Sequence, residues 1–161
     1  MRKVSTFLLF SIIVIFLFSG CNETNVNADI FQYKDSFVGD NSAVGNIANQ
    51  LPGGEHLNGF ELKTSEEPYG IILNYDWLNS EQEYKETVIY NATFLFTLVQ
   101  NVDWITFKSD RYEITITKED LQEWYGKEFS EVQNEDELKE LIQENLKDEN
   151  LVNQLLKSLS A

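Results

Sequence analysis

The chain has only one cysteine, Cys21, and one histidine, His56, among its 161 residues. A single cysteine cannot form a disulfide within the chain, and a single imidazole excludes zinc sites that require two of them. The sequence also lacks a Gly-x-Ser-x-Gly nucleophile elbow. The GDNSAVG segment at 39–45 lacks the Gly-Lys-Ser/Thr ending of a phosphate loop. We therefore predict no catalytic residues, no metal site and no cofactor, in a protein that is not an enzyme.

Basic residues are scarce as well: 12 lysines and arginines stand against 27 acidic residues, for a net charge of −15. A protein that binds nucleic acid needs a basic face to replace phosphate counterions, so we expect no nucleic-acid partner. Electrostatic adhesion to anionic lipid is disfavoured for the same reason. The aromatic share of 13% is high enough to supply the core of one folded domain.

The one long apolar run lies near the start of the chain, over residues 7–18, and only Ser11 interrupts it. Two basic residues precede the run, and the small residues Ser19 and Gly20 follow it, directly before Cys21. A basic start, an apolar centre and a small-residue end are typical of a signal peptide. The run is shorter than the roughly 20 residues of a membrane-spanning helix. A retained membrane anchor is the alternative interpretation.

The position of Cys21 after Phe18, Ser19 and Gly20 resembles the lipobox of bacterial lipoproteins, with Phe18 where leucine is usual. This resemblance implies that residues 1–20 are removed and that Cys21 becomes a lipid-bearing N-terminus, with acyl chains such as palmitate. Two acyl chains anchor a protein stably to a membrane. We therefore expect the protein at the cell membrane, lipid-anchored on the extracytoplasmic face. Residues 21–29 are predicted to form a polar tether, of which eight extended residues span at most about 26 Å.

Residues 30–130 are predicted to form an α+β domain with a small antiparallel sheet of two hairpins packed against helices. Apolar and polar residues alternate over 60–64 and again over 71–75, with a Glu-Glu-Pro-Tyr-Gly turn between them. This pattern predicts the first hairpin. The same alternation over 105–107 and 114–116 predicts the second hairpin.

Helices are predicted at three places in this domain. Ser42 is the expected N-cap of a helix over 42–51, which Pro52 and two glycines end. Residues 84–99 have a broad apolar stripe and should form the central buried helix. Their β-branched residues leave a strand at 87–90 as the alternative. Thr117 followed by Asp120 predicts a capping box and a short helix, which ends at Gly126.

Residues 131–161 are predicted to form a C-terminal amphipathic helical segment, and from residue 134 on it has no glycine, proline or aromatic residue. Asn134 with Glu137 is typical of a helix start, and we expect a break near 148–150. The leucine stripes are predicted to pack on the domain. The alternative is that they bind a partner, because exposed apolar stripes are uncommon in soluble monomers.

Four segments, YKDSFVGDNSAVGNI, GFELKTSEEPYGIILNY, NATFLFTLVQNVDWITF and YEITITKEDLQEWYG, together resemble one uncharacterised domain family, over residues 31–126. The most specific parts are VGDNSxVG and NVDxIxF. The family is a domain of unknown function found in lipoproteins of low-GC Gram-positive bacteria and in some membrane sensors of the metalloprotease-linked type. The resemblance implies an extracytoplasmic α+β domain with a sensing or interaction role, and it transfers no catalytic residue.

Two groups of residues are candidate binding sites. Asp35, Asp40 and Asn41 could gather around a calcium ion, which prefers oxygen ligands, although a turn that leads into a capped helix is the simpler interpretation. Asp76 and Trp77, next to Tyr75, could stack on a wall sugar, although aromatic residues more often pack in a core. His56 is expected in a surface loop.

The leading functional prediction is a non-catalytic, lipid-anchored cell-surface protein that binds or senses a cell-envelope component. Its partners would be the membrane, through the lipid on Cys21, and an envelope protein or cell-wall ligand. The alternative is an interaction subunit that docks on a membrane protein through its C-terminal helix. A cell-wall-acting enzyme is a further and disfavoured alternative. The sequence leaves the oligomeric state open.

Overall fold

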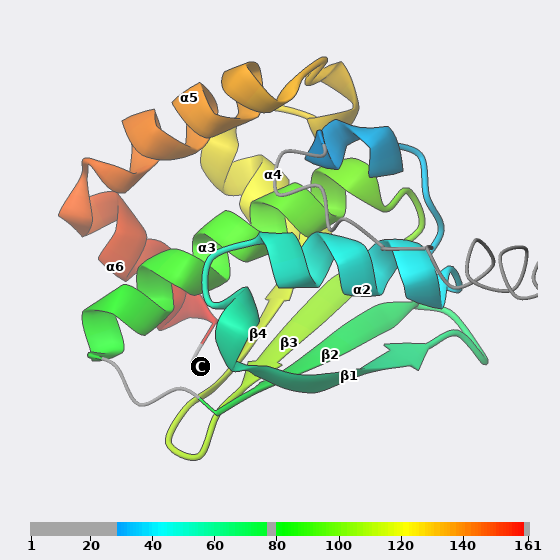
Figure 1. The fold of residues 1–161 in the computed structure, drawn as a ribbon. Coiled ribbons are helices and arrows are strands. Elements are labelled where there is room, and N and C mark those ends of the chain that lie inside the picture. Colours follow the sequence, from blue (N-terminus) through cyan, green and yellow to red (C-terminus); the bar gives the residue numbers. More distant parts are fainter. Residues whose placement is uncertain (1–28, 77–79, 160–161) are drawn as a thin grey trace, which may run out of the picture.

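The computed structural model describes residues 29–76 and 80–159 as a sheet with helices packed against it (Figure 1). The strands are β1 (Leu57–Lys63), β2 (Gly70–Tyr75), β3 (Trp104–Lys108) and β4 (Glu113–Thr117). The α-helices are α2 (Asn41–Gln50), α3 (Glu81–Leu98), α4 (Lys118–Tyr125), α5 (Glu135–Leu146) and α6 (Glu149–Ser158). Three short 3-10 helices are η1 (Ile30–Tyr33), η2 (Gly54–His56) and η3 (Phe129–Glu131). The α+β class predicted from the sequence is confirmed.

The four strands lie in the order β1-β2-β3-β4. Both predicted hairpins are present, because β1 pairs with β2 and β3 pairs with β4 in antiparallel fashion. The central pair, β2 and β3, is parallel, so the sheet is mixed and not antiparallel throughout as predicted. The reason is the long connection: an 18-residue helix rises about 27 Å and returns the chain to the end where β2 began.

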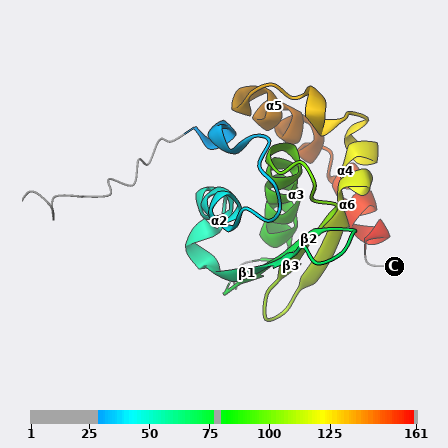
Figure 2. The same ribbon diagram turned by 90° about the vertical axis from the view of Figure 1, so that its right-hand side faces the viewer.

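The helix α3 is the crossover between the two hairpins, and every residue from Asn91 to Val99 is buried. This confirms the central buried helix predicted over 84–99 and excludes the alternative strand at 87–90. Its N-cap is Ser80, whose hydroxyl accepts a hydrogen bond from the Glu83 amide. Figures 1 and 2 show α2 and α3 on one face of the sheet, and among the described residues no helix covers the opposite, open face.

The helix α2 begins one residue earlier than predicted, and its N-cap is Asp40, not Ser42. The Asp40 carboxylate accepts hydrogen bonds from the amides of Ser42 and Ala43, at 3.1 and 3.0 Å. Asp and Ser are both strong N-cap residues. The choice between them depends on where the preceding loop turns, which the local sequence does not specify.

The C-terminal helices are part of the hydrophobic core. Asn134 caps α5 through the Glu137 amide, and Asp148 caps α6, which confirms the predicted helix start and the predicted break. Among the described residues after position 131, the large apolar side chain that stays exposed is Leu151, with a relative exposure of 39%. The buried apolar residues of the segment are Val132, Leu138, Ile142, Val152, Leu155 and Leu156. The stripe therefore packs on the domain, which leaves little of it for a partner.

Cys21, the predicted signal peptide and tether up to residue 28, and Trp77 lie outside the described residues. Within the described residues, every helix is too short or too polar to cross a membrane.

Candidate functional site

The end of the sheet where β2 and β3 begin brings together distant parts of the chain. The side-chain oxygen of Asn101 accepts a hydrogen bond from the Val38 amide, at 2.8 Å. The Asp103 carboxylate accepts one from the Tyr69 amide, at 2.6 Å, and the Asp103 carbonyl accepts one from the Lys118 amide, at 2.8 Å. The segments VGDNSxVG and NVDxIxF are thus in direct contact, and Asp103 connects the β1–β2 loop to the start of α4.

The Trp104 side chain lies on the open face of the sheet at this end. It stands opposite Gly70 in the parallel pair, and a Cβ atom on Gly70 would lie only 2.1–2.3 Å from three atoms of the indole. The indole N–H donates to the Pro68 carbonyl at 3.0 Å. Glycine is therefore required beneath the ring, and the ring is held at both its apolar surface and its polar edge.

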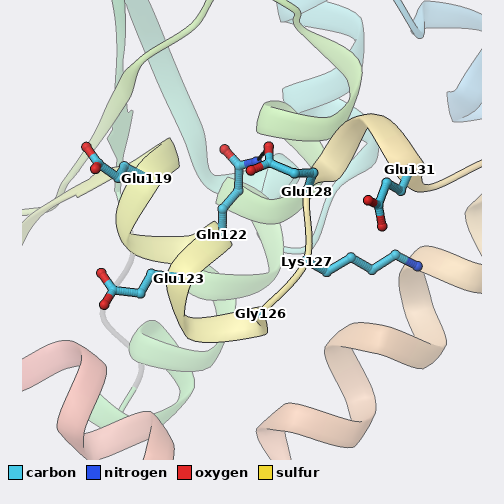
Figure 3. A pocket seen from close by; sticks show the side chains of 7 residues that line it. All are labelled: Glu119, Gln122, Glu123, Gly126, Lys127, Glu128 and Glu131. Atoms are coloured by element: carbon cyan, nitrogen blue, oxygen red, sulfur yellow. Dashed lines mark hydrogen bonds between the residues drawn. The ribbon is translucent and has the colours of Figure 1, made fainter.

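Three adjoining hollows form one shallow trough around Trp104. The first, of about 470 Å³, lies between α4 and η3, and its lining includes Glu119 and Gln122 (Figure 3). The second, of about 410 Å³, shares those two residues and also contains Trp104. The third, of about 400 Å³, shares Pro68 and Asp103 with the second. We call these three hollows together the trough.

The trough is lined mainly by carboxylates. Figure 3 shows Glu119 and Glu123 projecting from α4, while the Gln122 amide donates to Glu128 across the turn that follows α4. The acidic residues that line the trough are Glu67, Asp103, Glu119, Glu123, Glu128 and Glu131. Two cationic side chains also line the trough, those of Lys118 and Lys127. Its charge is therefore strongly negative, like that of the whole chain.

Both lysines of the trough have partners inside the protein. The Lys118 ammonium donates to the Gln100 carbonyl at 3.0 Å, and burial lowers its pKa, against the opposing attraction of Asp103 and Glu128. The Lys127 ammonium extends toward α5 in Figure 3 and lies 2.7 Å from the Glu137 carboxylate. Their hydrogen bond raises the pKa of Lys127 and lowers that of Glu137. Lys127 is therefore paired with a carboxylate outside the trough, whereas Lys118 keeps its positive charge near Asp103 and Glu128.

The residues considered for calcium have structural roles in the turn before α2. The Asp40 carboxylate caps α2. The backbone carbonyl of Asp35 accepts a hydrogen bond from the Gln100 side-chain amide, at 2.9 Å. Asn41 begins the helix, and its amide donates to the Gly39 carbonyl. Within residues 29–76 and 80–159, no three His, Cys, Asp or Glu side chains lie close enough together to hold a metal ion. The turn leading into a capped helix, the simpler of the two interpretations, is confirmed.

Of the residues considered for sugar stacking, Tyr75 and Asp76 lie within the described part of the chain. Tyr75 is buried at 3% exposure, and its ring stacks on Phe107. Burial raises the pKa of its hydroxyl to about 12, against the opposing hydrogen bond from Asn91. Asp76 is exposed and accepts a hydrogen bond from the Asn58 side chain. His56 is exposed on η2, as expected for a surface residue.

The fold and site define a small α+β domain with a mixed four-stranded sheet and an acidic trough at one end. Residues 30–118 match a domain of unknown function, DUF4825. The chain therefore belongs to the DUF4825 family. Searches among curated proteins and among solved structures found no match.

The trough was not predicted from the sequence. Its residues come from three separated segments, 67–69, 101–104 and 117–131, and no short spacing connects them. The part of the sequence that could have indicated the trough is the NVDxIxF segment. The side chains of its Asn101 and Asp103 both accept hydrogen bonds from backbone amides of other loops.

Proposed function

We propose that this protein is a non-catalytic binding protein of the cell envelope, held at the outer side of the membrane by a lipid on Cys21. The signal-peptide pattern that ends at Cys21 supports the anchor. The trough supports the binding role. It is an open surface, and hydrogen bonds with two other segments, residues 68–69 and Lys118, hold Trp104 and Asp103 in place at its centre.

The observation that carries the binding role is the rigid setting of Trp104. Large aromatic side chains with one fixed polar edge are the usual anchors of binding surfaces, because little side-chain entropy is lost when they are covered. The indole borders a hollow instead of being enclosed by the core. An envelope ligand could thus contact the ring without displacing any part of the fold.

The anchor is tested by the intact mass of the protein from membranes of an expressing bacterium. We expect a chain that starts at Cys21 and carries acyl groups. We expect Cys21→Ser to be released or misprocessed. Ser19→Ala is the matched control, because it retains a small residue before the cysteine and should leave processing unchanged. A full-length chain with an unmodified Cys21 would contradict the anchor.

The binding role is tested by photo-crosslinking on living cells. A photoreactive amino acid replaces Gln122, which lines the trough, in one variant, and replaces Gln143, an exposed residue of α5, in the other. We expect a discrete crosslinked product from position 122 that position 143 does not give. Equal products from the two positions, or none from position 122, would refute a binding role for the trough.

A further inference from the structure

We propose that the trough binds a basic peptide segment, with one lysine or arginine side chain resting on the exposed surface of Trp104. This inference rests on the proposed binding function and specifies the chemistry of the ligand. Neither the family membership nor the sequence patterns assign a ligand.

The indole provides the first contact. The face of a tryptophan ring attracts a cation, more strongly than that of tyrosine or phenylalanine. Trp104 packs against the Gly70 backbone, and its N–H is occupied by the Pro68 carbonyl. The ring surface that borders the second hollow is therefore the part that remains for a ligand. A ligand there meets an apolar ring without a free hydrogen-bond donor, which favours a cation over a neutral polar group.

Charge complementarity specifies the rest of the ligand. Six carboxylates line the trough. Only two lysines line it, and one of them, Lys127, is already paired with Glu137, so the carboxylates are in clear excess. The field in the trough therefore attracts cations. Because the three hollows adjoin one another, the carboxylates are distributed along a path on both sides of Trp104. This arrangement fits an extended segment with several charges better than a single ammonium ion.

The negative charge of the trough disfavours two other ligands, a second copy of the chain and an anionic lipid surface. A second copy of a chain with a net charge of −15 would bring like charges together. An anionic lipid surface would do the same. The open face presents Glu61 and Glu113 beyond the trough, each paired with a neighbouring lysine, Lys63 and Lys108. The hollow at the opposite end of the sheet has two carboxylates, Asp76 and Asp110, and one lysine, Lys108. The trough, with six carboxylates and two lysines, has the larger surplus of negative charge.

The proposal is tested by the binding of fluorescent octalysine to the full chain in uncharged detergent, with octaglutamate as the comparison. We expect octalysine to bind, octaglutamate not to bind, and added salt to weaken the affinity. Trp104→Leu should weaken octalysine binding about three- to tenfold. Trp124→Leu is the matched control, because Trp124 is also half-buried and its indole also donates to a backbone carbonyl, that of Leu151. It should leave the affinity unchanged.

A second pair of variants keeps the test valid if Trp104→Leu disturbs the fold. Glu119→Gln and Glu144→Gln each remove one negative charge from an exposed helix position, but only Glu119 lines the trough. We expect a two- to fivefold weaker affinity for Glu119→Gln alone. Equal effects would show attraction to net charge and would overturn the site. No binding of octalysine would also overturn it. If crosslinking from position 122 then persisted in cells, the binding function would stand with a ligand of different chemistry.

Discussion

At the scale of single residues, the sheet contains a close contact between Gly70 and the indole of Trp104. A Cβ atom on Gly70 would overlap the indole, so Gly70→Ala must push the ring away and break its hydrogen bond to Pro68. We expect a loss of about 1–3 kcal/mol in the free energy of unfolding, the usual effect of overpacking. Urea unfolding followed by circular dichroism measures it.

The matched control is Gly39→Ala. A Cβ atom there has no neighbour within 4 Å, so we expect the free energy of unfolding to change by less than about 0.5 kcal/mol. If both variants unfolded at the same urea concentration, the indole would not be held on Gly70 as described.

Residue-scale predictions from the sequence were accurate at both ends of α4, where the cause is local. The capping box of Thr117 and Asp120 and the left-handed Gly126 after α4 are both present, because each depends on residues within one helical turn. The contact of Trp104 with Gly70 could not be predicted in this way. It spans 34 positions of the chain and exists only because β2 and β3 pair in parallel register.

At the scale of elements, α5 and α6 differ in how far their leucines are buried. Leu138 of α5 has no exposed surface, whereas Leu151 of α6 is 39% exposed. We expect Leu138→Ala to lower the free energy of unfolding by about 2–5 kcal/mol, because it leaves a cavity in the core. Leu151→Ala, the same chemical change at an exposed position, should lower it by less than about 1 kcal/mol. Thermal unfolding of both variants in the full chain checks the difference, and similar losses would contradict the packing of α5.

The elements themselves were largely predictable, and their arrangement was not. Alternation located all four strands, and apolar spacing located the main helices, because burial of one face imposes these periods. The same patterns are compatible with parallel or antiparallel pairing of the two hairpins. The parallel pairing depends on the length of α3 and on its packing against the sheet, and these are properties of the whole chain.

At the scale of the whole molecule, the core extends well beyond the family match. The match ends at residue 118, yet the side chain of Phe129 stacks on Phe96 of α3, and α5 also contacts α3. One continuous cluster joins the sheet, α3 and both C-terminal helices. The acidic trough lies where the matched region meets these later elements, so its shape depends on both.

Because the core is shared, residues 30–130 should not fold without the C-terminal helices. A chain that ends at residue 130 lacks six buried apolar side chains, from Val132 to Leu156. Each contributes about 1.5–3 kcal/mol when buried, so their sum is comparable to the 5–15 kcal/mol that typically stabilises a domain. We expect this truncated chain to show no cooperative thermal transition by circular dichroism. A chain that ends at residue 159 keeps every described side chain and should unfold like the full chain. A cooperative transition near the full-length midpoint in the shorter chain would show that residues 30–130 fold independently.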